Sequence, residues 1–156
     1  MTLDEFSFRV RALEKSLYKT AICIVKNDHD AADCVQEALL SAWKNLKSLK
    51  NEAYFETWLT RIMINQCKIL IRSEKKQKSE ALSDIMPAPD RHETGVEYAL
   101  RQLDEKYRLP IVLHYINGFD VSEIAAILRQ PSGTVKTHLL RGRSALRKLL
   151  ESEVEL

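Results

Sequence analysis

Glycine and proline are scarce in this sequence, which has four of each among its 156 residues. Average usage is about 7% glycine and 5% proline, so the chain has roughly half the usual number of turn residues. Sandwiches and barrels of β-strands need turns every few residues, and dinucleotide-binding folds need glycine clusters, so both classes fit poorly. The shortage favours long, uninterrupted helices, and we predict an all-α fold.

Long apolar runs and paired cysteines are missing as well. The longest apolar runs, such as residues 21–25, fall far short of the roughly 18 residues that a membrane-spanning helix needs. The N-terminus is an acidic amphipathic stretch without the pattern of a signal peptide, so we expect a cytoplasmic protein. Cys23, Cys34 and Cys67 form no C-x-x-C pair, which argues against a disulfide framework and against a zinc site. We expect them to be small core residues.

Catalytic motifs are also lacking. The four histidines are dispersed, and the sequence contains no metalloprotease, nucleophile-elbow or phosphate-loop motif and no paired carboxylates. We therefore predict a binding protein with no catalytic residue, no metal and no cofactor.

Charge is unevenly distributed along the chain. The net charge is only +2, yet residues 129–148 contain six arginines or lysines and no aspartate or glutamate. Basic residues concentrated on one element are typical of a face that binds an anionic partner, most often nucleic acid. The alternative is a solvated basic face.

The first half of the chain has the apolar spacing of three helices. The first covers about residues 4–25, and the second follows a polar turn with an apolar stripe at Val35, Leu39, Trp43 and Leu46. After a loop at residues 47–52, the third covers about residues 53–72. We predict one helical module over residues 1–75.

Periodicity stops after this module and resumes near Val96. Residues 76–93 are mostly charged, small or polar and include two prolines, which is typical of a flexible linker. Periodic residues then continue past Pro110, which should kink the helix or confine it to one side. We predict a second small helical module over residues 94–156.

The second module contains the pattern of a helix-turn-helix over about residues 120–141. Asp120 and Glu123 have the spacing of a capping box before an apolar run, and Ser132 is a suitable N-cap for the long helix that follows. Two helices joined by so tight a turn make a helix-turn-helix, whose second helix can enter the major groove of DNA.

The long helix has the two faces that such binding requires. Val135, Leu139 and Leu146 share one side, and Thr137, Arg141 and Ser144 lie opposite. Its first turns, residues 132–141, are placed to reach base edges, and Arg141 suits a bidentate contact to guanine. Later basic residues suit phosphates. The alternative is an amphipathic helix with a solvated basic rim.

Aromatic and cationic residues alternate in the first module. Tyr54, Phe55 and Trp58 lie among lysines and Arg61, a combination that holds unpaired bases by stacking. Taken alone, the pattern favours core packing for Phe55 and Trp58, because aromatic residues at helical spacing usually face a core. Asn65 lies on a largely apolar helix, where its amide needs a partner, either a neighbouring helix end or a ligand.

One face of the second helix is polar instead of apolar. Asp33, Gln36 and Glu37 lie together on it. They form either ordinary solvated surface or an acidic docking surface for a basic protein partner.

Taken together, these motifs resemble the extracytoplasmic-function sigma factors of the sigma-70 family. The resemblance rests on residues 30–37 with Trp43, residues 55–62 with Asn65, and residues 123–125, 133–136 and 141–143. It covers nearly the whole chain in order except for the linker. It implies that the first module is sigma region 2 and the second is sigma region 4.

The resemblance also implies partners and roles for particular residues. Asp33, Gln36 and Glu37 would dock on the clamp helices of core RNA polymerase. The unpaired −10 promoter strand would be captured by Lys50, Asn51, Tyr54, Trp58, Arg61 and Asn65. The duplex −35 element would be bound by Ser132, Thr134, Lys136, Thr137, Leu140, Arg141 and Arg143. An anti-sigma factor would block these surfaces, and the protein itself would not lie in the membrane.

Two other functional classes remain open at this point. A plain helix-turn-helix regulator would bind duplex DNA without joining polymerase, usually as a dimer on two half-sites. A protein-interaction adaptor with an incidental basic surface would show no dependence on DNA.

Overall fold

The computed structural model describes residues 1–81 and 95–154. The described residues form helices and turns and no strand, so the all-α prediction is confirmed. The chain divides into two compact units, Met1–Lys75 and Lys76–Leu156. Residues 82–93 of the predicted linker lie outside the described residues.

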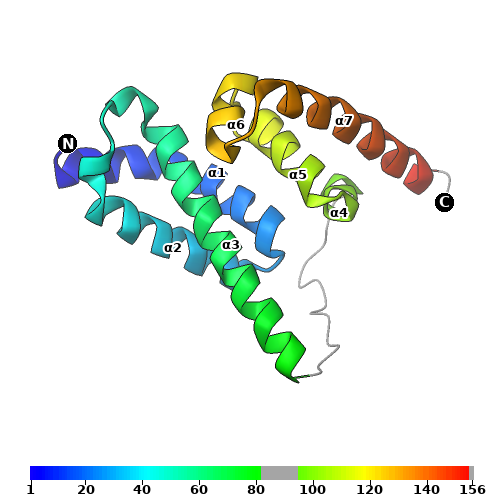
Figure 1. Ribbon diagram of the computed structural model, residues 1–156, viewed down its shortest axis with the longest axis horizontal. Helices are drawn as coiled ribbons and strands as arrows, with labels where there is room; N and C mark the ends of the chain where they lie inside the picture. Colours follow the sequence, from blue (N-terminus) through cyan, green and yellow to red (C-terminus); the bar gives the residue numbers. More distant parts are fainter. Residues whose placement is uncertain (82–94, 155–156) are drawn as a thin grey trace. The chain divides into compact units, whose positions relative to one another are not determined.

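Three long helices make up the first unit (Figure 1). They are α1 (Leu3–Val25), α2 (Asp28–Lys44) and α3 (Phe55–Ala81), and two single 3₁₀ turns, η1 (Leu46–Ser48) and η2 (Glu52–Tyr54), lie between α2 and α3. Phe6 of α1 joins the three, because its ring lies 5.2 Å from Trp43 of α2 and 5.8 Å from Phe55 at the start of α3. Aromatic side chains therefore form one end of this core.

The buried face of α2 differs from the predicted stripe. Its buried residues are mostly small, whereas Trp43 is 40% exposed. Small side chains let α2 pack closely on α1, whereas Trp43 contacts Phe6 at the edge of the core and keeps part of its ring exposed. The buried set is Ala31, Cys34, Val35, Ala38 and Ala42.

The third helix is longer than predicted. We expected it to end at Arg72, but α3 continues to Ala81, so residues 76–81 of the predicted linker are helical. Residues 74–78 are glutamate, lysine and glutamine, which favour helix even without an apolar face to bury. The apolar pattern ended before the helix did.

The second unit is built from shorter helices. They are α4 (Gly95–Gln102), α5 (Glu105–Ile111), α6 (Val121–Leu128) and α7 (Ser132–Val154), with a π-helical turn, η3 (Val112–Ile116), after α5. Pro110 lies one residue before the end of α5, as the prediction of a confined helix requires. Its missing N–H removes a donor from the α-helical ladder, and the wider π turn follows directly.

Local caps fix most helix ends. The predicted capping box of α6 is present, with Glu123 N–H donating to Asp120 Oδ1 at 2.8 Å and Asp120 N–H donating to Glu123 Oε1 at 3.1 Å. Ser132 is the first residue of α7 and not its cap, one position from the prediction. Two helices end on non-glycine residues in the left-handed conformation, Lys26 (φ 66°) and Arg129 (φ 54°).

Gly142 lies where α7 crosses α5. A Cβ atom at this position would lie 2.7 Å from Ile111 Cδ1 and 3.3 Å from Tyr107 Cβ. The missing side chain therefore allows the two helices to approach more closely than they could with any other residue at position 142. This contact explains a glycine inside a helix, where it is intrinsically unfavourable by about 1 kcal/mol.

Candidate nucleic-acid interface

Helix α7 presents one exposed polar face. Val135 and Leu139 are buried, whereas Lys136, Thr137 and Arg141 are exposed. Acidic residues are absent from the first nineteen positions of the helix, residues 132–150. The α6–turn–α7 arrangement thus exposes a basic face on the helix that a helix-turn-helix inserts into DNA.

The predicted −35 residues differ in their surroundings. Ser132 and Arg143 are exposed, while Thr134 is half-buried. Leu140 is 64% exposed, which suits an apolar contact with a thymine methyl group. The Thr137 hydroxyl donates to Gly133 O at 3.0 Å, and Arg143 Nη1 donates to the Tyr115 hydroxyl at 3.1 Å. The Tyr115 contact holds the Arg143 side chain toward η3.

The predicted −10 residues gather on η2, its preceding loop and the first turns of α3. Lys50 and Asn51 are exposed, and Tyr54 is 63% exposed. Phe55 is fully buried, which agrees with core packing for that ring. Trp58 is half-buried, and its Nε1 donates to Ser48 Oγ at 3.2 Å. Tyr54 is therefore the aromatic side chain of this group with the most open surface.

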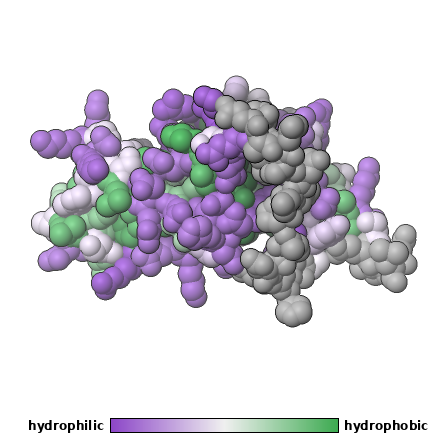
Figure 2. Space-filling view, turned by 90° about the horizontal axis from the view of Figure 1, so that it is seen from below, coloured by the Kyte–Doolittle hydropathy of each residue, from purple (hydrophilic) through white to green (hydrophobic). Residues whose placement is uncertain are grey.

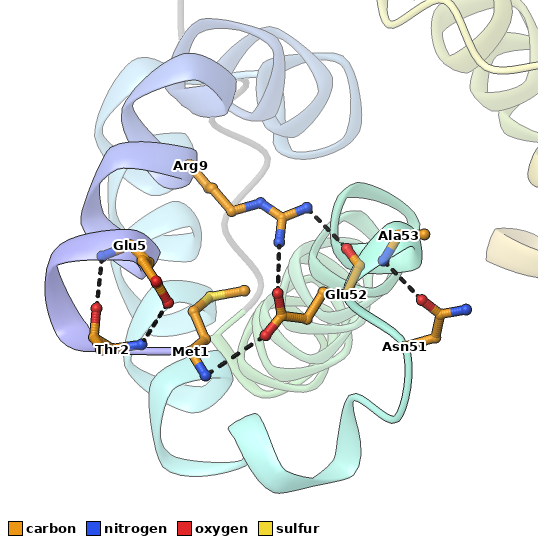
Figure 3. A network of polar contacts seen from close by, with 7 residues as sticks. All are labelled: Met1, Thr2, Glu5, Arg9, Asn51, Glu52 and Ala53. Atoms are coloured by element: carbon orange, nitrogen blue, oxygen red, sulfur yellow. Dashed lines mark hydrogen bonds and ion pairs between the residues drawn. The ribbon is translucent and has the colours of Figure 1, made fainter.

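A side chain that the sequence analysis missed supports this loop (Figure 3). Arg9 of α1 donates from Nη2 to Glu52 O at 2.8 Å, and its guanidinium lies 4.7 Å from the Phe55 ring centroid. The Glu52 carboxylate is 3.9 Å from Arg9 Nη1 and 3.5 Å from Met1 N. The Glu52 side chain is exposed, so these ion pairs contribute little, and the carbonyl bond and the ring contact are the stronger restraints on η2.

Asn65 lies on the outer face of α3 and is exposed. Because water satisfies an exposed amide, Asn65 does not need the neighbouring helix end that the sequence analysis gave as one alternative, and its role toward a ligand stays a prediction. Arg61, one turn earlier, is half-buried. The opposite face of α3 is the core face, with Leu59, Met63 and Cys67 all at 0% exposure.

The polar residues of α2 form a separate exposed face. Asp33, Gln36 and Glu37 are all exposed, and Leu40 beside them is 56% exposed. His29 Nε2 lies 3.6 Å from Asp33 Oδ2 across one helical turn. This face combines carboxylates with an apolar side chain, as a protein-docking surface requires.

Several histidines and cysteines of the described residues have structural surroundings. Among the described residues there is no group of histidine, cysteine and acidic residues that could hold a metal. His114 Nδ1 is 2.8 Å from Phe119 O, a structural contact. Burial raises the pKa of the Cys34 and Cys67 thiols, which keeps them protonated and unreactive.

The second unit also has an apolar groove that the sequence analysis missed. It has a volume of about 750 Å³ and lies among α4, α5, η3 and α7. Its lining residues are Val96, Leu100, Ile111, Tyr115, Ile116, Arg143, Leu146, Arg147, Leu150 and Glu151.

Hydrophilic side chains dominate the face drawn in Figure 2, with apolar patches between them. Over the described residues, no helix is both long and apolar enough to span a bilayer.

Comparisons with known proteins agree with the two units. The family model described as Sigma-70 region 2 matches residues 9–77, and the one described as Sigma-70, region 4 matches residues 95–146.

Full-length relatives are similar over almost the whole chain. The ECF RNA polymerase sigma factor SigM of Mycobacterium tuberculosis is 32% identical over 154 residues, covering 94% of this chain and 79% of the relative. SigW of Bacillus subtilis is also 32% identical, over 167 residues, covering 94% and 89%.

Solved structures give the same result. The sigma factor RpoE of Bartonella quintana, crystallised with the anti-sigma factor NepR, has a TM-score of 0.84 at 25% identity and covers 96% of this chain and 98% of its own. CnrH, in complex with the cytosolic domain of CnrY, has a TM-score of 0.76. This chain belongs to the extracytoplasmic-function sigma factors of the sigma-70 family.

Proposed function

We propose that this sigma factor recognises promoters through two separate DNA-binding faces. Region 4, assigned to residues 94–156, uses the exposed face of α7 to bind the duplex −35 element. Region 2, assigned to residues 1–75, uses the loop before α3 and the outer face of α3 to hold the unpaired −10 strand. The protein is non-enzymatic, acts in the cytoplasm, and supplies core RNA polymerase with promoter specificity.

The single observation that supports region 4 most strongly is the acid-free exposed face of α7 behind a capped α6. Arg141 is proposed to read guanine, and Leu140 a thymine methyl group, because these side chains reach outward from the first three turns. Lys136 and Arg143 are proposed to hold phosphates, with Ser132, Thr134 and Thr137 adding short polar contacts.

Region 2 has different chemistry because it meets single strands. Unstacking a base step costs a few kcal/mol, and stacking on an aromatic ring returns about 1–3 kcal/mol per base. Exposed Tyr54 and half-buried Trp58 are proposed as the stacking side chains, and Asn65 as the amide that reads a base edge. Lys50, Asn51 and Arg61 would hold the strand backbone.

Protein partners are proposed for the remaining surfaces. The exposed Asp33, Gln36 and Glu37 face would dock on the clamp helices of core polymerase. The two similar solved structures are both complexes, one of them between a sigma factor and an anti-sigma factor, which supports an anti-sigma factor as a further partner. The apolar groove of the second unit suits such a protein.

Transcription in vitro tests this function directly. Purified bacterial core polymerase is assayed with and without the protein on a promoter library, and start sites are mapped. Discrete starts that share two spaced upstream motifs support the proposal. If the protein binds DNA as a dimer on a palindrome and never joins core polymerase, it is a plain helix-turn-helix regulator.

Asn65→Ala and Glu37→Lys separate the two roles of region 2. Asn65→Ala should weaken promoter opening while leaving the affinity for core polymerase unchanged. Glu37→Lys should weaken the affinity for core polymerase and leave binding of the free promoter strand unchanged. The substitution removes a negative charge from the docking face, which is separate from the DNA-binding face. Equal effects of both variants in both assays would contradict the assignment.

A further inference from the structure

The indole of Trp58 is held from two sides. Its Nε1 donates to Ser48 Oγ at 3.2 Å, and its ring centroid lies 6.0 Å from that of Phe55, with the two ring planes tilted by 40°. Phe55 is fully buried, whereas Trp58 is half-buried. The buried ring and the hydroxyl therefore fix the direction of the indole and leave part of it open to solvent.

The Ser48 hydroxyl is itself oriented by the end of α2. It donates to Asn45 O at 2.8 Å, and because a hydroxyl has a single hydrogen, its lone pairs are left to accept the indole N–H. Asn45 is the C-cap of α2, and its N–H and its Nδ2 both donate to Ser41 O, at 3.0 Å and 2.9 Å. Ser48 thus connects a capped helix end to one edge of the Trp58 ring.

Tyr54, the other proposed stacking residue, lacks a comparable restraint. It is 63% exposed, and within the described residues its side chain makes no hydrogen bond and no ring contact. A side chain that is already ordered loses less conformational entropy when a ligand binds to it. Trp58 is therefore the preformed ring of the two, and Tyr54 would have to be ordered by the strand.

We infer that Ser48 is a positioning residue that sets the Trp58 indole for stacking on an unpaired base. This inference rests on the proposed −10 role of Trp58. Ser48 acts through Trp58 and needs no contact of its own with DNA. Without the hydroxyl, the indole N–H would bond to water and the ring would turn about its side-chain torsions, so the base would meet a less ordered surface.

Fluorescence of Trp58 tests whether Ser48 holds the ring. The chain has two tryptophans, so Trp43→Phe leaves Trp58 as the single reporter in the full chain. Ser48→Ala should raise the quenching of Trp58 by acrylamide and lower its fluorescence anisotropy, whereas Ser48→Thr, which keeps a hydroxyl, should leave both unchanged. Ser16→Ala is the matched control, because the Ser16 hydroxyl also donates to a carbonyl three residues earlier in the same unit.

Affinity for an unpaired −10 strand then tests whether this order matters for binding. The full chain is bound to core polymerase, and the anisotropy of a fluorescent label on the strand is followed. Ser48→Ala should weaken strand binding by about twofold to tenfold, as expected for the loss of one hydrogen bond. Ser48→Thr and Ser16→Ala should bind the strand as the unchanged protein does. In a Trp58→Phe background, which lacks the indole N–H, Ser48→Ala should have no further effect.

The results separate this inference from the proposed function. If Ser48→Ala leaves strand affinity unchanged while Trp58→Ala lowers it, Trp58 stacks without help from Ser48 and the inference is wrong. If Ser48→Ala weakens binding equally in the Trp58→Phe background, Ser48 acts on the strand by itself, which also overturns the inference. Unchanged strand binding by Trp58→Ala would instead overturn the proposed stacking role, and the positioning role of Ser48 with it.

Discussion

The two proposed DNA-binding faces are supported in different ways. In the first unit, the proposed contacts come partly from a loop, and side chains far apart in sequence hold that loop, with Arg9 bonded to Glu52 O. In the second unit, all the proposed contacts lie on one helix, and backbone packing at Gly142 sets its position. Polar side-chain restraints thus support the single-strand face, and close helix packing supports the duplex face.

The largest effect should come from filling the space at Gly142. Gly142→Val should destabilise the second unit by about 1–3 kcal/mol, because the new side chain overlaps Ile111 and Tyr107. Thermal unfolding followed by circular dichroism measures the loss, and −35 binding should fall with it. Gly133→Val is the control, since a Cβ there meets nothing within 4 Å. Equal destabilisation by both variants would show that packing against α5 is unimportant.

Removing single arginines from α7 should separate base reading from phosphate binding. Arg141→Ala should lose about 1–3 kcal/mol of promoter binding and relax specificity at one position, whereas Arg147→Ala should weaken all sequences evenly. Binding to a set of −35 variants at fixed salt distinguishes the two. A uniform loss for Arg141→Ala would contradict its proposed base contact.

A smaller effect is expected for the support of the loop. Arg9→Ala removes one hydrogen bond and one cation–π contact, together about 1 kcal/mol, so binding of the unpaired −10 strand should weaken about fivefold. Arg11→Ala, an exposed arginine two residues later, should leave binding unchanged. If Arg9→Ala also leaves strand binding unchanged, η2 holds its position without this restraint.

The smallest effect should come from Tyr115→Phe. This change removes the hydroxyl that accepts a hydrogen bond from Arg143, at an exposed site where such losses stay within about 0.5 kcal/mol. Affinity for the −35 duplex should barely change, whereas Arg143→Ala should reduce the salt slope by about 1. A large loss for Tyr115→Phe would mean that Arg143 must be held in place in order to bind phosphate.

The sequence predicted best the features that depend on neighbouring residues. The Asp120–Glu123 capping box and the buried and exposed faces of α7 follow from short-range spacing, and the structure has both. The end of α3 was missed because its last residues bury nothing and leave no apolar pattern. Trp43 was placed in the apolar stripe of α2 because of its helical spacing, whereas it is partly exposed and the buried face consists mostly of alanines.

Contacts between distant residues could not be predicted at all. Arg9 and Glu52 are 43 positions apart, and nothing in either local sequence indicates the other. Gly142 is intrinsically unfavourable within a helix, but its partners on α5 depend on how the helices cross and cannot be read from the neighbouring residues. The exposure of Asn65 likewise depends on how α3 packs against the other helices, so the sequence alone could not predict it.

The left-handed residue in the turn of the helix-turn-helix has a further consequence for how this protein tolerates change. Arg129 adopts φ 54° where a glycine would avoid about 1–2 kcal/mol of steric strain. Its cation, however, lies at the C-terminal end of α6, where positive charge is favourable by about 0.3–1 kcal/mol. A glycine would also give the unfolded chain more conformational freedom, which would lower the free energy of unfolding by about 0.4–1 kcal/mol. These opposing contributions nearly cancel, so a substitution of arginine by glycine at position 129 should leave the free energy of unfolding nearly unchanged. It would nevertheless change the net charge of the protein by one.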